Sequence, residues 1–423
     1  MTWTLLFTAV LFLRPQDLLP PLEALHLAEL TALAGLAALV FGRLGRGQAP
    51  IRLTPDLVGV IGLGAVILLT APFSIWMGGS LHVFQDLYSK VILAYLLTVN
   101  VISSPRRLER LTWLLVLAVG FIGFRATLDY VRGANMVGHG TRVQGAVGGL
   151  MQNPNDLALN MVAFLPLAAA VAMRREASVL KRGIAALCAL FMVGAIVASG
   201  SRGGFLGFVA MTLVMGVVTV RRHPGFVIGG ALVALLALPA LPGAYWHRIA
   251  SITDSSKDDF GSEATRRTLL AESFRAFEEN PLTGVGAGEF KDWDPKDREQ
   301  AWHEAHNVFL QVAAELGILG LAVFAFLIAR AFTAVFQTRR LLRRATLDAD
   351  AESFLYSHSA AMTASLVGWL ICALFASVAY NWTFYYLLAL AATPREMLRD
   401  RQPARVRIGA RARAVRPLAE AVQ

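Results

Sequence analysis

The stretch GIAALCALFMVGAIVASGSRGGFLGFVAMTLVMGVVTV, residues 183–220, decides the fold class. Two runs without a charged residue, 183–199 and 203–220, stand on either side of a short turn that contains Arg202. Uncharged runs of roughly this length can cross the hydrocarbon core of a bilayer, which is about 30 Å thick, as helices. The stretch therefore predicts two membrane helices with one permanent cation where they meet.

The same pattern recurs along the chain. Of its 423 residues, 56% are hydrophobic and only 16% are charged, which is less charge than a soluble domain of this size carries. The composition predicts an all-α polytopic membrane protein with about twelve transmembrane helices, the first of them short. The predicted helices lie near residues 2–13, 22–41, 56–74, 88–102, 111–128, 155–173, 183–199, 203–220, 225–244, 307–336, 358–378 and 381–393.

Basic residues gather in alternate loops between these segments, as they do on the cytoplasmic side of membrane proteins. This pattern places both chain ends inside and accounts for most of the net charge of +10. Anionic lipid headgroups explain a basic inner face, so we predict contact with membrane lipids and none with nucleic acid. The basic loop residues are Arg43, Arg46, Arg52, Arg106, Arg107, Arg110, Arg174, Arg175, Lys181, Arg182, Arg221, Arg222, Arg339, Arg340, Arg343 and Arg344.

One loop, 245–306, is long enough to form a subdomain. It lies on the outer side in the predicted topology and holds most of the acidic residues outside the apolar segments. The predicted organisation is therefore N-terminal membrane helices (1–244), an outer subdomain containing helices (245–306), C-terminal membrane helices (307–394) and a basic cytoplasmic tail (395–423).

Arg202 falls on the outer side, where a basic residue runs against the inside bias of membrane proteins. One interpretation is an arginine at a helix end that extends its guanidinium to the lipid headgroups. The other is an anion site, because Gly203 and Gly204 leave backbone N–H groups bare at a helix start and guanidinium binds phosphate well. We favour the anion site.

A second outer arginine lies in the long loop. Residues 262–280 are predicted to form a helix, in which Arg266 aligns with the buried stripe and Arg267 belongs to a neighbouring face. The predicted stripe consists of Leu270, Phe274 and Phe277. An arginine on such a stripe either pairs with an acid or points at a ligand, and the local pattern leaves both interpretations open.

His306 stands at the outer end of the segment that begins near residue 307. The helix face below it carries small residues, which would let another helix come close. These residues are Ala313, Gly317 and Gly320. A helix cap is the plain interpretation, but with two outer arginines nearby in the topology we favour a catalytic base, because imidazole accepts a proton near neutral pH. His303 is a rival for that role. Arg142, in another outer loop, is either a further phosphate contact or a solvated arginine.

Metal and cofactor chemistry find no support in the sequence. The outer loop has no cluster of histidine, cysteine and carboxylate residues with ligand spacing, and the chain has no Gly-rich phosphate loop. Cys188 and Cys372 lie within apolar segments and are expected to be small core residues. We therefore predict neither a metal nor a cofactor.

Three short motifs, in this order, resemble those of the bacterial O-antigen ligases. The turn SRGG at 201–204 resembles an arginine-bearing turn of that superfamily, and Arg266 followed by Leu270 resembles its R-x3-L motif. His306-Asn307, then nine residues, then Gly317-Ile318-Leu319-Gly320 resembles its H-[NSQ]-x9-G-x-x-[GTY] motif. The opening FLRPQDLLPPL, 12–22, is similar to the O-glycosylation ligases associated with exosortase systems.

This resemblance implies a GT-C-like glycosyltransferase of the bacterial inner membrane, with its active site facing the periplasm. The implied donor is a glycan on undecaprenyl pyrophosphate. Its diphosphate would be bound by Arg202 and Arg266, with Arg142 as a further contact. His306 would take the proton of the acceptor hydroxyl, and Asn307, Gly317 and Gly320 would support it. Direct attack would invert the anomeric carbon without a metal.

The sequence leaves the acceptor open. Lipid A–core is the preferred acceptor and would make the chain an O-antigen ligase, a protein hydroxyl would make it an O-linked oligosaccharyltransferase, and a growing glycan would make it an O-antigen polymerase. A transporter of anions or lipid-linked glycans, with a similar number of spans, is the alternative outside enzymes. The long outer loop and the lack of a clear two-half repeat favour the enzyme.

Overall fold

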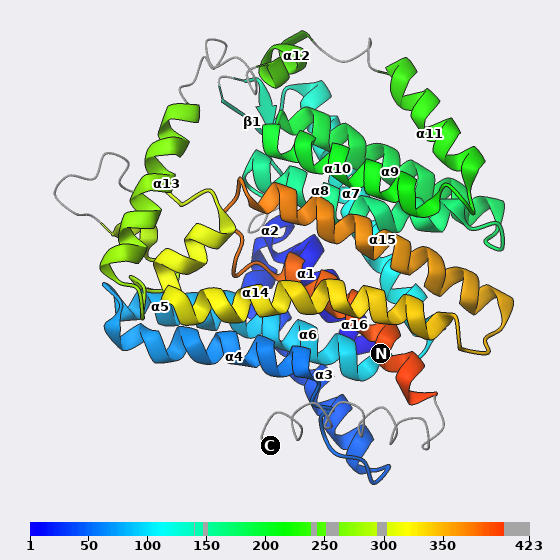
Figure 1. Ribbon diagram of the computed structural model, residues 1–423, viewed down its shortest axis with the longest axis horizontal. Helices are drawn as coiled ribbons and strands as arrows, with labels where there is room; N and C mark the ends of the chain where they lie inside the picture. Colours follow the sequence, from blue (N-terminus) through cyan, green and yellow to red (C-terminus); the bar gives the residue numbers. More distant parts are fainter. Residues whose placement is uncertain (139, 147–150, 238–242, 251–261, 294–302, 402–423) are drawn as a thin grey trace, which may run out of the picture.

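The computed structural model describes residues 1–138, 140–146, 151–237, 243–250, 262–293 and 303–401. These ranges are almost entirely helical (Figure 1), apart from a short antiparallel pair of strands, β1 (Met136–Val137) and β2 (Arg142–Val143). The helices are α1 (Thr2–Leu13), α2 (Pro15–Leu18), α3 (Leu27–Leu44), α4 (Pro55–Thr70), α5 (Met77–Val83), α6 (Ser89–Val101), α7 (Pro105–Arg132), α8 (Pro154–Met173), α9 (Val179–Ser199), α10 (Arg202–Thr219), α11 (Pro224–Ala237), α12 (Gly243–Ala250), α13 (Ser262–Glu279), α14 (Val308–Leu342), α15 (Ala349–Ala373) and α16 (Trp382–Asp400).

A helix lies in each apolar segment predicted from the sequence, which confirms the all-α polytopic class. Seven helices of the described ranges are long and apolar enough to cross a membrane, and α1, α6 and α11 are shorter, with 12, 13 and 14 residues. Twelve spans therefore remain a prediction. The seven are Pro20–Leu44, Pro55–Phe73, Pro105–Arg132, Pro154–Met173, Val179–Ser199, Arg202–Thr219 and Val308–Leu342.

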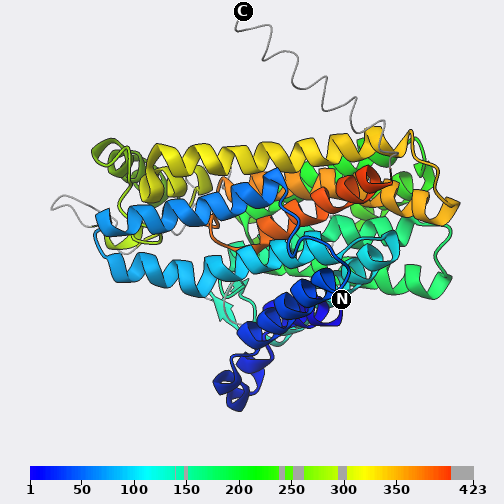
Figure 2. The ribbon, with the colours of Figure 1, turned by 90° about the horizontal axis from the view of Figure 1, so that it is seen from below.

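The long helices form a bundle that α13 closes at one end. Helices α4, α6, α14 and α16 lie together, while α7, α8, α9 and α10 pack on the side of α15 (Figure 1). Helix α3 projects from the bundle, and α11 stands apart from its neighbours (Figures 1 and 2). Helix α13 crosses the end of the bundle at which α14 begins.

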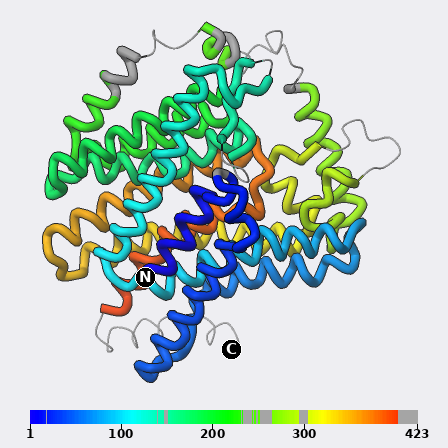
Figure 3. The backbone as a smooth tube through the Cα atoms, turned by 180° about the vertical axis from the view of Figure 1, so that it is seen from behind, coloured from blue at the N-terminus to red at the C-terminus, as the bar shows by residue number. Residues whose placement is uncertain are grey.

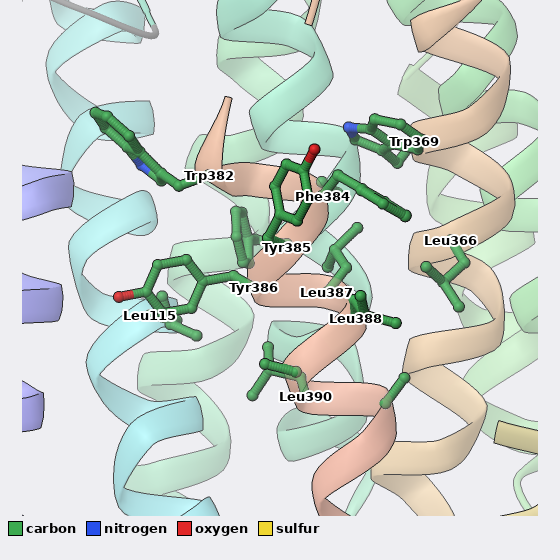
Figure 4. Packing of buried hydrophobic residues seen from close by; sticks show 14 of the residues in the cluster. Leu115, Leu366, Trp369, Trp382, Phe384, Tyr385, Tyr386, Leu387, Leu388 and Leu390 are labelled. Carbon is green, nitrogen blue, oxygen red and sulfur yellow. The ribbon is translucent and has the colours of Figure 1, made fainter. Parts of the chain in front are cut away.

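Helix α16 forms the centre of the core. It is apolar on all sides over its first three turns, and a helix of that kind is buried on all sides. Aromatic rings surround it, and the rings of Trp369 and Phe384 stack with centroids 4.6 Å apart (Figure 4). The short helix α1 belongs to the same core, because Phe12 is buried and packs edge-to-face on Tyr386. Figure 3 shows α1, next to the N-terminus, lying against the bundle.

A buried group of charges joins α4, α14 and α16. The Asp56 carboxylate accepts hydrogen bonds from Arg330, at 2.5 Å, and from Arg395, and the side chains of Asp56 and Arg395 are both fully buried. Arg395 also donates to Glu396, at 2.8 Å. The predicted tail begins at 395, whereas α16 continues to Asp400, so the first basic residue of that tail is part of the packed bundle. The rest of the predicted tail, 402–423, lies outside the described residues.

Replacing Asp56 by asparagine is expected to lower the free energy of unfolding by about 1–3 kcal/mol, because the fully buried Arg395 would lose one of its two acidic partners and keep only Glu396. The measurement is thermal unfolding of the purified protein in detergent. Asp400→Asn is the matched control, since that carboxylate pairs with Arg52 at 2.6 Å but is 55% exposed, and its loss should cost about 0–1 kcal/mol. Equal losses of stability in Asp56→Asn and Asp400→Asn would contradict a stabilising role for the buried group of charges.

Candidate active site

A cavity of about 260 Å³ lies where α10 and α14 begin and where α15 ends, beside α13. Both α10 and α14 run from this cavity toward basic residues, Arg221 and Arg339, at their far ends. The cavity brings together Arg202, Arg266 and His306, three residues that the sequence predicts for one site from separate segments. Its lining consists of Arg202, Gly203, Leu206, Arg266, Arg267, Leu270, Ala305, His306, Leu374 and Phe375.

Arg202 is the first residue of α10 and is held by the packing of the helix start. Ser201 caps the helix, because its Oγ accepts from the Gly204 N–H at 3.1 Å, and Arg202 itself is only 8% exposed. A Cβ on Gly203 would lie 2.9 Å from Phe375, and one on Gly204 would lie 2.5 Å from a neighbouring side chain of α8. The two glycines thus permit close packing. The prediction that the Gly204 N–H is open to a ligand is wrong, because this N–H donates to the capping Ser201 Oγ.

Arg142 is not among the residues that line the cavity; it lies behind the turn that carries Arg202. Its Nε donates to the Ser199 carbonyl at 2.9 Å, and its Nη2 donates to Asn155 Oδ1 at 2.8 Å. The same Oδ1 accepts from Ser201 Oγ at 2.9 Å. Arg142 therefore ties β2 and the start of α8 to the turn before Arg202. Arg142 is therefore neither a solvated arginine nor one of the residues that line the cavity.

Helix α13 presents a different face to the protein from the one predicted. Its buried positions are Leu269, Ser273 and Ala276, each 0% exposed, and they pack toward the start of α14 and the 285–293 segment. The predicted stripe is one residue out of register, because Leu270 is 36% exposed and Phe274 is 52% exposed. As a result, Leu270 faces the cavity instead of the core.

This register also decides where the α13 arginines lie. Arg266 is half-buried and Arg267 is exposed, and both line the cavity, although the sequence assigns Arg267 to a neighbouring face. A cavity beside a helix can receive consecutive residues, since they are only about 100° apart around the axis. The cavity lining therefore contains three arginines, Arg202, Arg266 and Arg267, and this side chain is well suited to bind an anionic ligand.

His306 precedes helix α14 instead of opening it. Its φ of 49° is in the left-handed region, which costs a non-glycine residue on the order of 1 kcal/mol. Asn307 is the helix cap, because its Oδ1 accepts from Phe309 N at 3.0 Å and from Leu310 N at 3.1 Å. The His-Asn pair therefore divides two tasks: Asn307 starts the helix, and His306 turns toward the cavity.

The His306 imidazole is electrically neutral at physiological pH. Burial lowers its pKa to about 4, and the positive charges of Arg266 and then His303 add to the effect. A neutral ring has a free nitrogen lone pair and can accept a proton. His303 is exposed and is not among the lining residues, so the structure places His306, not its rival, beside the arginines.

Gly317 breaks α14 three turns below His306. Its φ of 63° and ψ of −163° are not helical, and the backbone of 281–286 enters the break. Val285 N donates to the Ala314 carbonyl at 2.8 Å, and Ile318 N donates to the Pro281 carbonyl at 2.8 Å. The predicted reason for Gly317, close approach of another helix, is therefore wrong. The 281–286 loop occupies the break in α14, and the same loop fixes the end of α13.

The other motif glycine, Gly320, has a different role. A Cβ on Gly320 would lie 2.3 Å from the Leu316 Cβ of the same helix, so the crowding comes from the break itself. Gly284, on the inserted loop, has a φ of 67°, and a Cβ there would lie 2.2 Å from the Glu315 backbone. Both glycines therefore serve the junction that sets the position of the 281–306 segment.

Gly317→Ala is expected to destabilise the protein by about 1–3 kcal/mol from backbone strain alone, since this φ/ψ region belongs to glycine. A clash adds to it, because the new Cβ would lie 2.5 Å from the Leu282 carbonyl oxygen. Thermal unfolding in detergent checks the loss. Gly62→Ala, in the middle of α4 with nothing within 4 Å, is the control and should change little. A Gly317→Ala variant as stable as Gly62→Ala would contradict the proposed break.

Two features of the cavity have no counterpart among the predicted site residues. Arg267 is assigned to another helix face by periodicity alone, and Leu374 and Phe375 follow α15 in a segment with no local signal. For Arg267, the only cue in the sequence is that it directly follows another arginine, Arg266. Among the described residues, no group of three or more histidine, cysteine, aspartate or glutamate side chains could hold a metal ion.

Comparison with known proteins gives a match to one protein family. Residues 187–325, about a third of the chain, match the family model described as O-antigen ligase. The matched segment runs from within α9 to within α14, so it contains Arg202, Arg266, Arg267, His306 and Gly317. A search of curated proteins gives no match. The family match supports membership of the O-antigen ligase superfamily.

Proposed function

We propose that this chain, a member of the O-antigen ligase superfamily, is a glycosyltransferase that moves a glycan from undecaprenyl pyrophosphate to an acceptor hydroxyl. The observation that carries the proposal is the meeting of Arg202, Arg266, Arg267 and His306 in one cavity. Three permanent cations suit a diphosphate, and one neutral imidazole suits a base. Neither the arginines nor the imidazole alone would indicate transfer of a glycan from a lipid diphosphate to a hydroxyl.

The arginines bind the donor and stabilise its departure. A diphosphate diester carries two negative charges, and the leaving diphosphate gains a third when the bond from the anomeric carbon to oxygen breaks. Three arginines match this larger charge best, so their attraction grows as the bond breaks. Each planar guanidinium can also contact two phosphate oxygens at once.

His306 activates the acceptor. Its neutral ring takes the proton of the acceptor hydroxyl while that oxygen forms a bond to the anomeric carbon, and the electron pair of the breaking bond stays on the diphosphate. Attack from the side opposite the leaving group inverts the anomeric configuration. No metal is needed in this scheme, because arginine charges take the place of a Lewis acid.

The rest of the cavity suits a lipid-linked donor at a membrane surface. Leu206, Leu270 and Phe375 provide an apolar wall next to the arginines. Basic residues such as Arg221 and Arg339 lie at the far ends of α10 and α14, and the inside bias of basic residues supports a cavity on the periplasmic face of the inner membrane. We propose about twelve spans in a GT-C-like arrangement.

The acceptor is proposed from the sequence resemblance. Lipid A–core would make the protein act in lipopolysaccharide biosynthesis. A protein hydroxyl and the end of a growing glycan are the other two acceptors to compare, because the proposed chemistry requires only a hydroxyl group. All three reactions use the same donor chemistry and the same base.

Purified protein in lipid nanodiscs should transfer glycan from the lipid-linked donor to one of these three acceptors, with a chelator present. The product linkage, determined by NMR, should be inverted relative to the donor. Loss of activity with the chelator, restored by one divalent ion, would contradict the metal-free scheme. Movement of the intact donor across proteoliposomes without transfer would instead support the transporter.

A further inference from the structure

The connection between α15 and α16, residues 374–381, contacts both halves of the candidate site. Toward α10, Phe375 lies against Gly203, and the nearby Cys372 Sγ donates to the Gly203 carbonyl at 3.5 Å. Toward α14, Asn307 Nδ2 donates to the Leu374 carbonyl at 3.3 Å. This connection lies outside the segment that matches the family model. It is nevertheless the piece of chain that joins the arginine of α10 to the histidine before α14.

One residue of this connection, Ser377, bonds directly to the backbone of His306. The His306 N–H donates to Ser377 Oγ at 2.9 Å. The Ser377 hydroxyl also lies near the Glu304 carboxylate, where it lowers the pKa of that carboxyl against the larger, opposing effect of burial. Ala379 N donates to Gln311 Oε1 at 3.1 Å, which fixes the next turn of α14 to the same connection.

We infer that Ser377 is a positioning residue for the transfer reaction, which holds His306 in its left-handed conformation and so keeps the imidazole beside the arginines. The inference rests on the proposed function of His306. A left-handed residue persists only where its surroundings fix it, and the Ser377 hydroxyl is the side chain that accepts from the amide of this residue. Without that acceptor, the 305–307 backbone can turn toward ordinary φ values and swing the ring out of the cavity.

Loss of the Ser377 hydroxyl should lower kcat and change the pH dependence of transfer, and it should leave donor affinity unchanged. The donor is held by Arg202, Arg266 and Arg267, none of which bonds to Ser377 in the described contacts. A ring displaced by about 1 Å is expected to slow transfer about 10- to 100-fold. Once it leaves its buried place near Arg266, its pKa should rise from about 4 toward the ordinary value, so the acid limb of kcat/KM should move to higher pH.

The expected shift of the acid limb depends on the charged and titratable residues that face His306. Arg202 comes from α10, Arg266 and Arg267 from α13, and His303 and Glu304 from the segment of His306 itself. The arginines and His303 are unchanged in a Ser377 variant, whereas Glu304 loses a neighbouring hydroxyl, which raises the pKa of its carboxyl and favours its neutral form. Less negative charge near the ring would lower the pKa of His306, so a shift of the acid limb to higher pH reports movement of the imidazole.

The test compares Ser377→Ala, which removes the acceptor, with Ser377→Thr, which keeps a hydroxyl. Glycan transfer by purified protein is measured from pH 3.5 to 8 with the undecaprenyl-diphosphate donor, alongside donor affinity and thermal unfolding. Ser365→Ala is the matched control, since that buried hydroxyl of α15 has no hydrogen-bond partner in the structure. The expected result is a lower kcat and a raised acid limb in Ser377→Ala, unchanged donor affinity, and recovery in Ser377→Thr.

Three results would overturn the inference: Ser377→Ala as active as Ser365→Ala, equal damage in the alanine and threonine variants, or a lower kcat with an unmoved acid limb. His306→Ala is run in parallel. If it transfers normally, the proposed function of His306 fails first. If it is inactive while Ser377→Ala is normal, only the positioning role of Ser377 is lost.

Discussion

Replacing His306 by alanine is expected to lower the rate of glycan transfer about 10²- to 10⁴-fold, which is the usual contribution of a general base. Donor affinity should stay nearly unchanged, because the arginines and not the imidazole hold the diphosphate. Transfer and donor binding are measured separately on purified protein. His303→Ala is the control, since that residue is exposed and does not line the cavity, and it should lose little activity.

Two outcomes would contradict this role. If His303→Ala is inactive and His306→Ala is normal, the base is the other histidine. If both variants are active, the acceptor is deprotonated without a histidine, and the positive field of the arginines carries the reaction alone.

The pH dependence of the wild-type protein follows from the same residue. The base works only when neutral, and the pKa of His306 in the free protein is lowered to about 4, so kcat/KM should be flat near neutrality and fall only as the pH approaches 4. Bound diphosphate adds negative charge near the ring and raises its pKa. The acid limb of kcat should therefore lie at higher pH than that of kcat/KM.

Replacing Arg202 or Arg266 by alanine is expected to reduce transfer about 10²- to 10³-fold, because each removes a cation that stabilises the leaving diphosphate. Lysine should restore little, since an ammonium is a point charge without the planar fork. The two variants should also bind the donor more weakly, which separates them from His306→Ala. Activity and donor affinity are measured at equal amounts of folded protein.

Arg275→Ala is the matched control for the arginine variants. Arg275 lies on the same helix as Arg266, is exposed, and pairs with Glu279 at 2.9 Å away from the cavity lining. It should behave as wild type. Normal transfer by both Arg202→Ala and Arg266→Ala would remove these residues from the site, and equal damage in Arg275→Ala would show that general positive charge, not the cavity, matters.

Two of the residues that line the cavity could be predicted from the sequence because each has a local signal. Arg202 interrupts two uncharged runs, and His306 precedes an apolar segment, so the predicted topology puts them on one face. Local signals do not fix side-chain direction. Arg142 shares the same predicted face, yet its guanidinium is turned to Ser199 and Asn155 behind the turn.

The face of α13 shows a second limit of sequence patterns. Leu269, Ser273 and Ala276 form one stripe of the helix, and Leu270, Phe274 and Phe277 form the next, with the larger side chains. Periodicity favours the larger set for burial, but the protein buries the smaller set. Small side chains let the helix approach α14, and of the larger set Leu270 lines the cavity whereas Phe274 is 52% exposed.

Two other contacts between distant segments could not be predicted from local sequence patterns. The break at Gly317 depends on the 281–286 backbone entering α14, and Asp56 depends on arginines that lie far along the chain. A helix-period pattern continues through both places without interruption. Only the folded chain shows why a glycine is needed at 317 and how a buried carboxylate at 56 is neutralised.

The most direct measurement compares two donors that differ only in their link: the same glycan joined to the same polyprenol through a diphosphate or a monophosphate. Wild-type protein in nanodiscs is given each donor with the same acceptor. Three guanidinium groups around one cavity predict transfer from the diphosphate donor that is about 100-fold faster or more. Equal rates from the two donors, or transfer from neither, would contradict a cavity built to hold and release a lipid-linked diphosphate.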